Sequence, residues 1–173
     1  MLPYWRERNG KAVDNNKQCD FTIQNLGECT IPSPVTVSYF TSDKKRILFN
    51  IYLHQYDHAK SPDGRPLSLE VAGPRAQIFF DPSKTKCGIV TCGGLCPGIN
   101  NVIRGIVLEL YYMYGVENIY GIPYGLQGFI PSYRHSFVEL TPSYVENIHE
   151  MGGTVLGSSR GSQDVGEVVD AIE

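Results

Sequence analysis

Residues 86–104, KCGIVTCGGLCPGINNVIR, decide the fold. They open with a short apolar run, Cys87 to Cys92, that is rich in β-branched residues, which is the pattern of a fully buried strand. The chain then turns through a segment of glycine and proline, residues 93–98. Beyond the turn, the i, i+3, i+4, i+7 spacing of an amphipathic helix is followed by Ile103, Ile106, Val107 and Leu110. The stretch therefore predicts a strand, a tight turn and a helix.

A glycine-rich turn between a strand and a helix is suited to binding an anion. Glycine lets backbone N–H groups approach a ligand closely, and the helix start carries partial positive charge. Gly93 and Gly98 have the outer spacing of a P-loop, but Ile99-Asn100 stands where that motif has Lys-Ser/Thr. The spacing also departs from the G-x-G-x-x-G of dinucleotide sites. Two interpretations stay open: a nucleotide or sugar-phosphate site, or a tight turn that merely needs glycine.

Without a P-loop lysine, another cation must balance a bound phosphate, and the candidates are Arg104 and Arg160. Arg160 lies in a second loop of small residues, GSSRGSQD at 157–164, just before a predicted helix. A planar guanidinium there could grip two phosphate oxygens and neutralise charge on a transferring phosphoryl group. The alternative is a surface arginine paired with Asp164, four residues on.

The composition is that of an ordinary soluble protein, with 42% hydrophobic and 19% charged residues among 173. The formal net charge is −3, and without a basic run this disfavours nucleic acid as a partner. The longest apolar runs fall far short of the ~20 residues that a membrane-spanning helix needs. The first residues, MLPYWRERNGK, lack the apolar core of a signal peptide. We therefore expect a cytoplasmic protein with no membrane partner.

Cysteine and histidine patterns allow metal sites without requiring them. The five cysteines are Cys19, Cys29, Cys87, Cys92 and Cys96. Cys92 and Cys96 permit a metal or redox pair, yet zinc sites usually need closer spacing and two further ligands. Reduced, partly buried thiols are therefore the preferred interpretation. His54 and His58 are also spaced for a metal, but without a third ligand we prefer surface histidines and predict no metal site.

An arm and a β-rich extension precede the main domain. Residues 1–30 show no sustained period, and we expect a mobile or partner-draped arm. Within residues 31–70, two segments alternate apolar with polar residues, which predicts two strands that could form a hairpin. Their apolar members are Val35, Val37 and Tyr39, then Ile47, Phe49, Ile51 and Leu53.

Residues 71–173 are expected to form the first part of a nucleotide-binding α/β domain. The predicted elements are a strand at 87–92, a helix at 100–114, a strand at 118–123, a helix from Thr141 to Gly152, a short strand at 155–156 and a helix at 163–173. Alternating strands and helices imply a doubly wound, Rossmann-like parallel sheet, incomplete in this chain. Because ligands bind beyond the carboxyl ends of such strands, both glycine loops should share that edge.

Several ordered motifs resemble those of the 6-phosphofructokinases. They are TCGGLCPGIN at 91–100, VIRG at 102–105, GIPYGLQGF at 121–129, NIHEMGG at 147–153 and TVLGSSRGSQD at 154–164. AGPR at 72–75 and FFDP at 79–82 are similar to the lead-in of the long-armed ATP-dependent branch, found in plants, trypanosomatids and some bacteria. The resemblance covers about residues 70–173 and, more loosely, 31–69.

The resemblance implies roles for individual residues. Gly93 and Gly94 match backbone that contacts ATP phosphate. Arg160 and Gly161 match a second ATP-binding pair, and Arg160 also matches a catalytic position near the transferred phosphoryl group. Arg104 matches an effector-phosphate position of bacterial relatives, a role we do not transfer because the long-armed branch is regulated differently.

The nucleotide side shows one departure from the family pattern. Leu126 stands where relatives often have a tyrosine beside the nucleotide. The resemblance further implies a GGDGT-like segment whose aspartate holds Mg²⁺ and a TIDND-like segment with the catalytic base, both beyond Glu173. We therefore expect an N-terminal portion that is inactive alone.

The implied activity is phosphoryl transfer from ATP, with Mg²⁺, to the 1-hydroxyl of fructose 6-phosphate in a homo-oligomer, a tetramer or a dimer. Two alternatives stay open. One is a phosphofructokinase that uses pyrophosphate as the donor. The other is a non-catalytic nucleotide-binding or subunit-assembly module.

Overall fold

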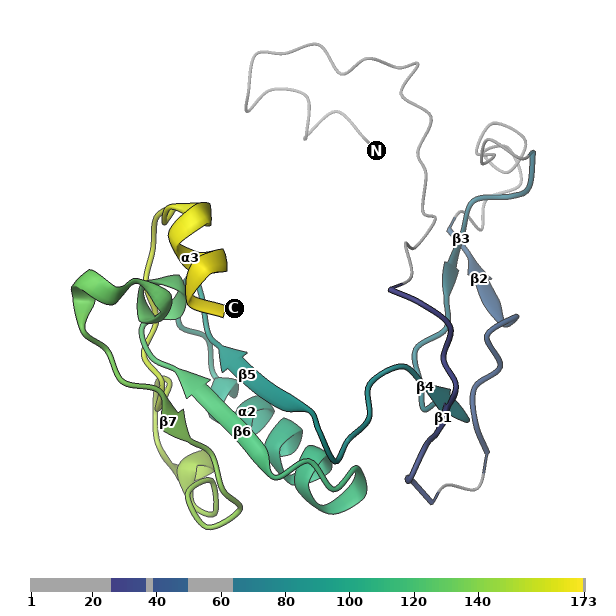
Figure 1. The fold of residues 1–173 in the computed structure, drawn as a ribbon, viewed down its shortest axis with the longest axis horizontal. Coiled ribbons are helices and arrows are strands. Elements are labelled where there is room, and N and C mark those ends of the chain that lie inside the picture. The colour runs from purple at the N-terminus through teal and green to yellow at the C-terminus, as the bar shows by residue number, and fades with distance from the viewer. Residues whose placement is uncertain (1–25, 37–38, 50–63, 173) are drawn as a thin grey trace. The chain divides into compact units, whose positions relative to one another are not determined.

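A computed structural model describes residues 26–36, 39–49 and 64–172 (Figure 1). The chain forms two compact units, residues 1–28 with 39–76 and residues 29–38 with 77–173, and each is described by itself. Most of the predicted arm, together with His54 and His58, lies outside the described residues.

The first unit contains a two-stranded antiparallel sheet. β2 (Arg46–Leu48) pairs with β3 (Ser68–Glu70), with Ile47 opposite Leu69. The predicted hairpin between the two alternating segments is therefore wrong for the described residues. The partner of β2 instead lies later in the chain, and the Arg46 side chain crosses this pair, its Nε donating to the Ser68 hydroxyl over 2.8 Å.

Arg75, from the AGPR motif, holds the same unit together. Its two terminal nitrogens donate to the carbonyls of Thr41, at 3.0 Å, and Val71, at 2.6 Å. Its Nε lies 3.1 Å from an oxygen of Asp43. Charged donors on three acceptors make this arginine a structural clamp rather than a surface charge.

The second unit contains a three-stranded sheet in the order β5-β6-β7. Its strands are β5 (Lys86–Val90), β6 (Asn118–Ile122) and β7 (Val138–Glu139). β5 and β6 are parallel, as predicted, whereas β7 joins β6 antiparallel. A small antiparallel pair, β1 (Ile31–Pro32) with β4 (Gln77–Ile78), belongs to the same unit. The architecture is therefore mixed α/β with one parallel pair.

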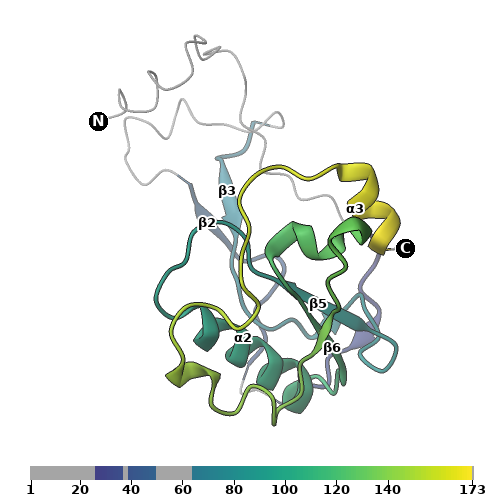
Figure 2. The ribbon, with the colours of Figure 1, turned by 90° about the vertical axis from the view of Figure 1, so that its left-hand side faces the viewer.

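One helix connects the parallel strands. α2 (Ile99–Leu108) lies behind the β5–β6 pair in Figure 1 and to the left of the two strands in Figure 2. It continues as a short π-helix, η1 (Glu109–Met113), up to the turn at Gly115. Ile103 and Val107 are buried against the sheet, but Ile106 is 42% exposed, contrary to the predicted stripe. Among the described residues, the core cluster includes Ile103 and Val107, with Leu110 packed against it, and leaves Ile106 outside.

The core joins α2 and β6 to the segments that follow them. Its buried members are Ile103, Val107, Val116, Ile119, Leu140, Val145, Ile148 and Leu156. Gly121 on β6 leaves room for this packing, because a Cβ there would collide with the side chain of Leu156. The side chain of Leu156, from a distant segment, thus packs over β6, the middle strand of the sheet.

The segment from Thr141 departs from the predicted helix. It is a run of turns with one short 3₁₀ helix, η4 (Ile148–Glu150). Thr141 does start a turn, since its side-chain oxygen accepts from the backbone N–H of Tyr144 over 3.1 Å. Val145 and Ile148 are the buried residues of this segment, and the turns bring both into the core without a regular helix.

The predicted strand at 155–156 is also absent. The N–H of Val155 donates to the side-chain oxygen of Asn100, at 2.9 Å, and the N–H of Leu156 donates to the hydroxyl of Thr154, at 3.2 Å. Side chains therefore satisfy the backbone groups that a sheet would otherwise pair.

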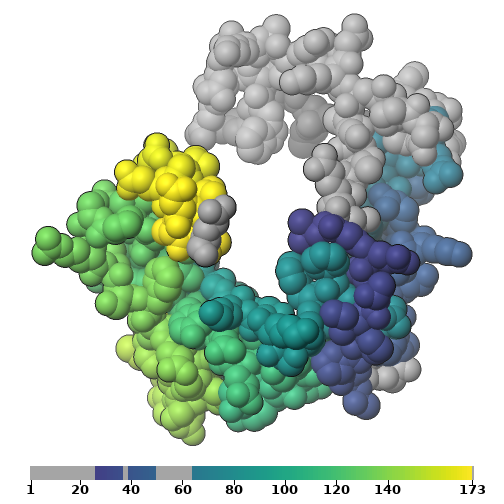
Figure 3. All heavy atoms as spheres, in the orientation of Figure 1, coloured from purple at the N-terminus to yellow at the C-terminus, as the bar shows by residue number. Residues whose placement is uncertain are grey.

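The last predicted helix is confirmed as α3 (Val165–Ile172). The carboxylate of Asp164 caps it by accepting from the N–H of Glu167 over 2.9 Å. α3 packs on the 3₁₀ helix η2 (Gly125–Phe129), and the two segments lie against each other in Figure 3. No helix within the described ranges is long and apolar enough to cross a membrane.

Asn100 gives a test of this packing. It is only 2% exposed, and its amide nitrogen donates to the carbonyl of Met151 at 3.0 Å while its oxygen accepts from Val155. Asn100→Ala should lower the free energy of unfolding by about 2 kcal/mol, because it removes two part-buried hydrogen bonds that join α2 to residues 151–155. The exposed neighbour offers the control: Asn101→Ala should cost less than about 0.5 kcal/mol. Equal urea-unfolding curves for the two variants would contradict the assignment.

Candidate functional site

Three loops meet at the carboxyl edge of the β5–β6 pair. One leaves β5 at residue 91, one leaves β6 at residue 123, and the third, residues 154–161, comes from the core without a preceding strand. The backbone N–H of Tyr124 in the second loop donates to the carbonyl of Leu156 in the third, at 2.7 Å. The predicted meeting of the two glycine loops at one edge is confirmed by their hydrogen bonds.

The first and third loops are bonded directly to each other. The N–H of Gly93 donates to the carbonyl of Ser159 over 3.3 Å, and the hydroxyl of Ser158 donates back to the carbonyl of Gly93 over 3.0 Å. The hydroxyl of Thr91 donates to the carbonyl of Gly157 at 2.6 Å. These reciprocal bonds fix the separation of the two loops.

The sequence-predicted site residues come together at this seam. We call Gly93, Gly94, Arg160 and Gly161 the cradle. Arg160 lies beside Gly94, because a Cβ added to residue 94 would be 3.5 Å from a terminal nitrogen of Arg160. All four residues are exposed to solvent. A cation and flexible backbone therefore face solvent at one place, as an anion site requires.

The N–H groups of the cradle are not equivalent. That of Gly93 is taken by Ser159, whereas those of Gly94 and Gly161 enter no hydrogen bond among the described residues. Gly93 instead contributes its backbone angle, φ +90°, which only glycine adopts readily. The donors that remain for a ligand are the two free N–H groups and the guanidinium.

Arg160 and Arg104, the two candidate cations, have different contacts in the structure. Within the described ranges Arg160 forms no ion pair with Asp164, whose carboxylate caps α3 instead. Arg104 donates through Nε to the carbonyl of Glu146 at 3.2 Å. Arg104 is thereby engaged with the turns before η4, and Arg160 is the cation of the cradle.

Aromatic rings border the cradle on the side of the second loop, and sequence reasoning missed them. Tyr124 has φ +55°, a left-handed conformation that costs a non-glycine residue about 1–2 kcal/mol. Its ring centre lies 4.6 Å from that of His135, which in turn stacks on Tyr133 at 6.1 Å. The signal available in sequence was a tyrosine directly before the glycine of a strand–loop junction.

The thiols near the site do not form a metal centre. No group of three or more His, Cys, Asp or Glu in the described part of the chain is arranged to hold a metal ion. Cys92 and Cys96 are exposed free thiols. Cys87 is half-buried on β5, and burial raises its pKa, which keeps the thiol protonated at neutral pH.

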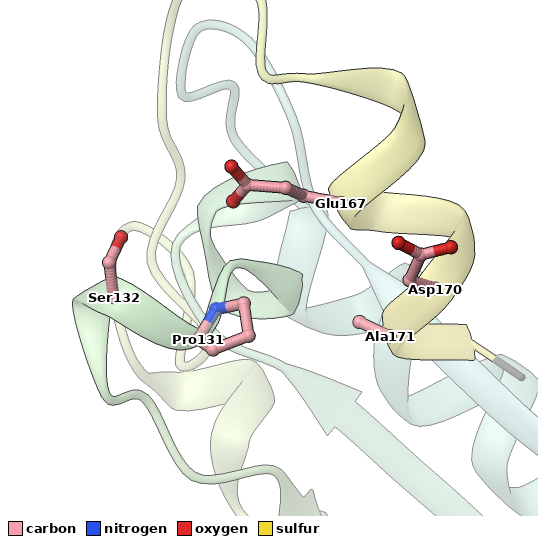
Figure 4. A pocket seen from close by; sticks show the side chains of 5 residues that line it. All are labelled: Pro131, Ser132, Glu167, Asp170 and Ala171. Atoms are coloured by element: carbon pink, nitrogen blue, oxygen red, sulfur yellow. The ribbon is translucent and has the colours of Figure 1, made fainter.

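A hollow of about 380 Å³ lies between α3 and the 3₁₀ helix η3 (Pro131–Tyr133). Figure 4 shows Glu167 and Asp170 on the α3 side and Pro131 and Ser132 on the other. Two carboxylates at its wall would repel a phosphate. The hollow is therefore not where the phosphate-binding groups converge.

Comparison with known proteins gives a family and close relatives. The model of the family described as Phosphofructokinase matches residues 86–173. The chain is 43% identical to the ATP-dependent 6-phosphofructokinase of Borreliella burgdorferi over 165 residues, which are 91% of this chain and 36% of that protein. It is 47% identical to that of Trypanosoma brucei brucei over 161 residues, 90% of this chain and 33% of that protein. It is 49% identical to ATP-dependent 6-phosphofructokinase 2 of Arabidopsis thaliana over 117 residues, 68% of this chain and 26% of that protein. The chain thus spans about a third, or less, of each of these relatives.

Gly125 provides a test of the close packing at this edge. It has φ +61°, and a Cβ there would lie 2.8 Å from the Ser159 hydroxyl and 3.2 Å from the Cys92 sulfur. Gly125→Ala should therefore lower the free energy of unfolding by about 1–3 kcal/mol. The matched control is Gly105→Ala within α2, where nothing lies near the added methyl group; it should raise stability by about 0.5–1 kcal/mol. Thermal unfolding of both variants tests this prediction. A Gly125→Ala variant as stable as wild type would contradict the close packing at this edge.

Proposed function

The chain belongs to the phosphofructokinase family, and we propose that its cradle binds the phosphate tail of ATP for transfer to the 1-hydroxyl of fructose 6-phosphate. The observation that carries this proposal is the convergence of Arg160 on Gly94 from two loops that are distant in sequence. The relatives named above are ATP-dependent, which favours ATP over pyrophosphate as the donor. The product of this transfer is fructose 1,6-bisphosphate, an intermediate of glycolysis.

The residues of the cradle make different contributions to binding a phosphate. Gly93 sets the turn, and the free N–H groups of Gly94 and Gly161 are available to donate to phosphate oxygens. The guanidinium of Arg160 can take two oxygens at once. As charge moves onto the phosphoryl oxygens during transfer, the fixed cation of Arg160 stabilises it, which is the main contribution that proteins make to this reaction.

Mg²⁺ and a general base are not assigned to these residues. The family implies Mg²⁺ with ATP, but no cluster of carboxylates in the described residues fits a metal ion. Asp164, the acid nearest Arg160 in sequence, caps α3. We therefore derive no step through Mg²⁺ or through a base from this chain.

The finer fold assignment follows from the same proposal. β5, α2 and β6 would be the first βαβ unit of a doubly wound, Rossmann-like sheet, within a domain that begins near residue 71. The parallel pair and the position of the cradle at its carboxyl edge support this. A cytoplasmic homo-oligomer, a dimer or a tetramer, belongs to the proposal on family grounds.

Arg160 is the residue to test by binding. Arg160→Ala should weaken ATP binding by roughly ten- to a hundredfold, because charge-assisted hydrogen bonds to phosphate are lost. Arg160→Lys should fall between, since it keeps the charge but not the two-oxygen geometry. Lys84→Ala removes an exposed cation from elsewhere in the chain and should leave affinity unchanged. Isothermal titration calorimetry measures the affinity of each variant for ATP. Equal affinities for wild type and Arg160→Ala would contradict the proposed role of Arg160 in phosphate binding.

Turnover is best measured in a chimera. This chain would replace the matching segment of the Borreliella burgdorferi relative, which supplies the remaining length. A coupled assay should detect fructose 1,6-bisphosphate, and Arg160→Ala in the chimera should lower kcat by at least about a hundredfold. A folded chimera that phosphorylates fructose 6-phosphate equally well with and without Arg160 would refute the catalytic role.

A further inference from the structure

Two threonine hydroxyls meet where the third loop reaches the end of β5. The hydroxyl oxygen of Thr91, the first residue after β5, lies 3.2 Å from that of Thr154, and both residues are half-buried. The hydroxyl of Thr91 donates to the carbonyl of Gly157 at 2.6 Å, and the hydroxyl oxygen of Thr154 accepts from the N–H of Leu156 at 3.2 Å. The two contacts of Thr91 join residues that are 63 and 66 positions apart in the chain.

The protons of these hydroxyls all run in one direction. Each hydroxyl carries a single proton, and that of Thr91 is used on Gly157. Thr154 must therefore be the donor in the contact between the two oxygens, while its own oxygen accepts from Leu156. The result is a chain of hydrogen bonds from the N–H of Leu156, through both hydroxyls, to the carbonyl of Gly157. Hydrogen bonds that follow one another in this way strengthen each other.

This chain decides what Thr91 can do at the site. Because its proton points to Gly157, Thr91 has none to donate to a phosphate oxygen. The same holds for Thr154, whose proton is used on Thr91. Neither hydroxyl therefore donates to a bound phosphate, and their contribution comes from the segment that they hold in place.

The segment that they hold is the one that carries Arg160. Gly157 is three residues before Arg160. The other hydrogen bonds between the first and third loops use the backbone of Gly93, which lies inside the glycine turn with φ +90°. The bond of Thr91 starts instead from a residue that directly follows β5, which is paired with β6 along its whole length. Thr91 thus fixes the Arg160 segment to the sheet, whereas Gly93 only joins one loop to the other.

We propose that Thr91 is a positioning residue for the proposed phosphate site: its hydroxyl, supported by that of Thr154, holds Arg160 beside Gly94. This inference rests on the proposed function, since Arg160 must bind phosphate for its placement to matter. Without the hydroxyl, the carbonyl of Gly157 loses its partner and the Arg160 segment is held less firmly. A guanidinium that is fixed in advance loses little freedom when the ligand arrives, so a loosened one binds the same phosphate more weakly.

A double-mutant cycle tests whether Thr91 acts through Arg160. ATP is titrated into the 173-residue chain and into its Thr91→Val, Arg160→Ala and doubly substituted variants, and calorimetry measures each affinity. Valine has the shape of threonine without the hydroxyl, so Thr91→Val should weaken ATP binding by about fivefold, the equivalent of one neutral hydrogen bond. In the Arg160→Ala background the same substitution should change the affinity by less than about twofold, because the group that Thr91 positions is gone.

Two further variants separate positioning from a general loss of stability. Thr91→Ser keeps the hydroxyl and should retain wild-type affinity for ATP. Thr85→Val is the matched control, because it removes another part-buried hydroxyl that donates at 2.6 Å to a backbone carbonyl, that of Asp81. The two valine substitutions should cost similar stability, yet Thr85→Val should leave the affinity for ATP unchanged.

The outcomes separate this inference from the function on which it rests. Equal affinities of wild type and Arg160→Ala for ATP contradict the proposed function itself. If Arg160→Ala binds more weakly but Thr91→Val does not, or if the two losses simply add, Thr91 does not position Arg160 and the inference is wrong. Should Thr91→Val fail to fold, Thr154→Val replaces it in the cycle with the same expectation, since it removes the other hydroxyl of the chain.

Hydrogen exchange gives a second measurement where the doubly substituted variant binds ATP too weakly for calorimetry. In the unliganded chain, the amides of Gly93 and Tyr124 donate to carbonyls of the third loop, whereas that of Val102 donates within α2. Thr91→Val should accelerate exchange at Gly93 and Tyr124 and leave Val102 unchanged, because only the third loop is loosened. Equal acceleration at all three amides, or none, overturns the inference.

Discussion

The two hydrogen bonds of Asn100 are the constraint on which the rest of the site depends. The residue lies in the first turn of α2, yet its side chain binds the backbone on either side of Gly152 and Gly153, about fifty positions later in the chain. A buried amide is costly unless both its donor and its acceptor are paired, so this arrangement tolerates only one placement of the later segment. From that placement the chain runs directly into the Arg160 loop. Asn100 stands where a P-loop would have serine or threonine. Here its side chain orders the Arg160 loop instead.

In the proposed phosphate site, this arrangement lets a cation from another loop take the place of a P-loop lysine. The bonds of Gly93 to Ser158 and Ser159 hold the loops at a separation that puts Arg160 beside Gly94. The same bonds use the N–H of Gly93, so the glycine that sequence reasoning placed against phosphate acts through its backbone angle. Rigid positioning of donors in advance is what makes such a site effective, since little ordering remains when the ligand arrives.

Sequence reasoning succeeded where local pattern decides the structure. The strands β5 and β6 were predicted from short apolar runs, and the helices α2 and α3 from their helical period. The expectation that β5 is fully buried is wrong, because its residues alternate between half-buried and exposed. The two glycine loops do meet, as predicted, although no strand precedes residues 157–161. Sequence reasoning failed between residues 141 and 156, where the backbone is satisfied by side chains that are distant or non-repeating, such as Asn100 and Thr154. Hydrogen bonds between a side chain and a distant backbone group leave no repeating pattern in the sequence. The antiparallel strand β7 was not predicted because its two residues are too few to show alternation.

The conformation of Tyr124 could not be predicted from the sequence for a different reason, which concerns backbone strain. A tyrosine in the left-handed region is unfavourable by itself, so propensity points away from it, and only the surrounding structure holds it there. The surroundings that do so are the bond to Leu156, the bare backbone of Gly157 and the ring of His135. Replacing Gly157 with any larger residue would push the ring away from the segment that carries Arg160. The glycines of this edge therefore differ in their surroundings. At residues 93 and 94 they border the space proposed for a ligand, whereas at residues 125 and 157 they make room for other parts of the protein.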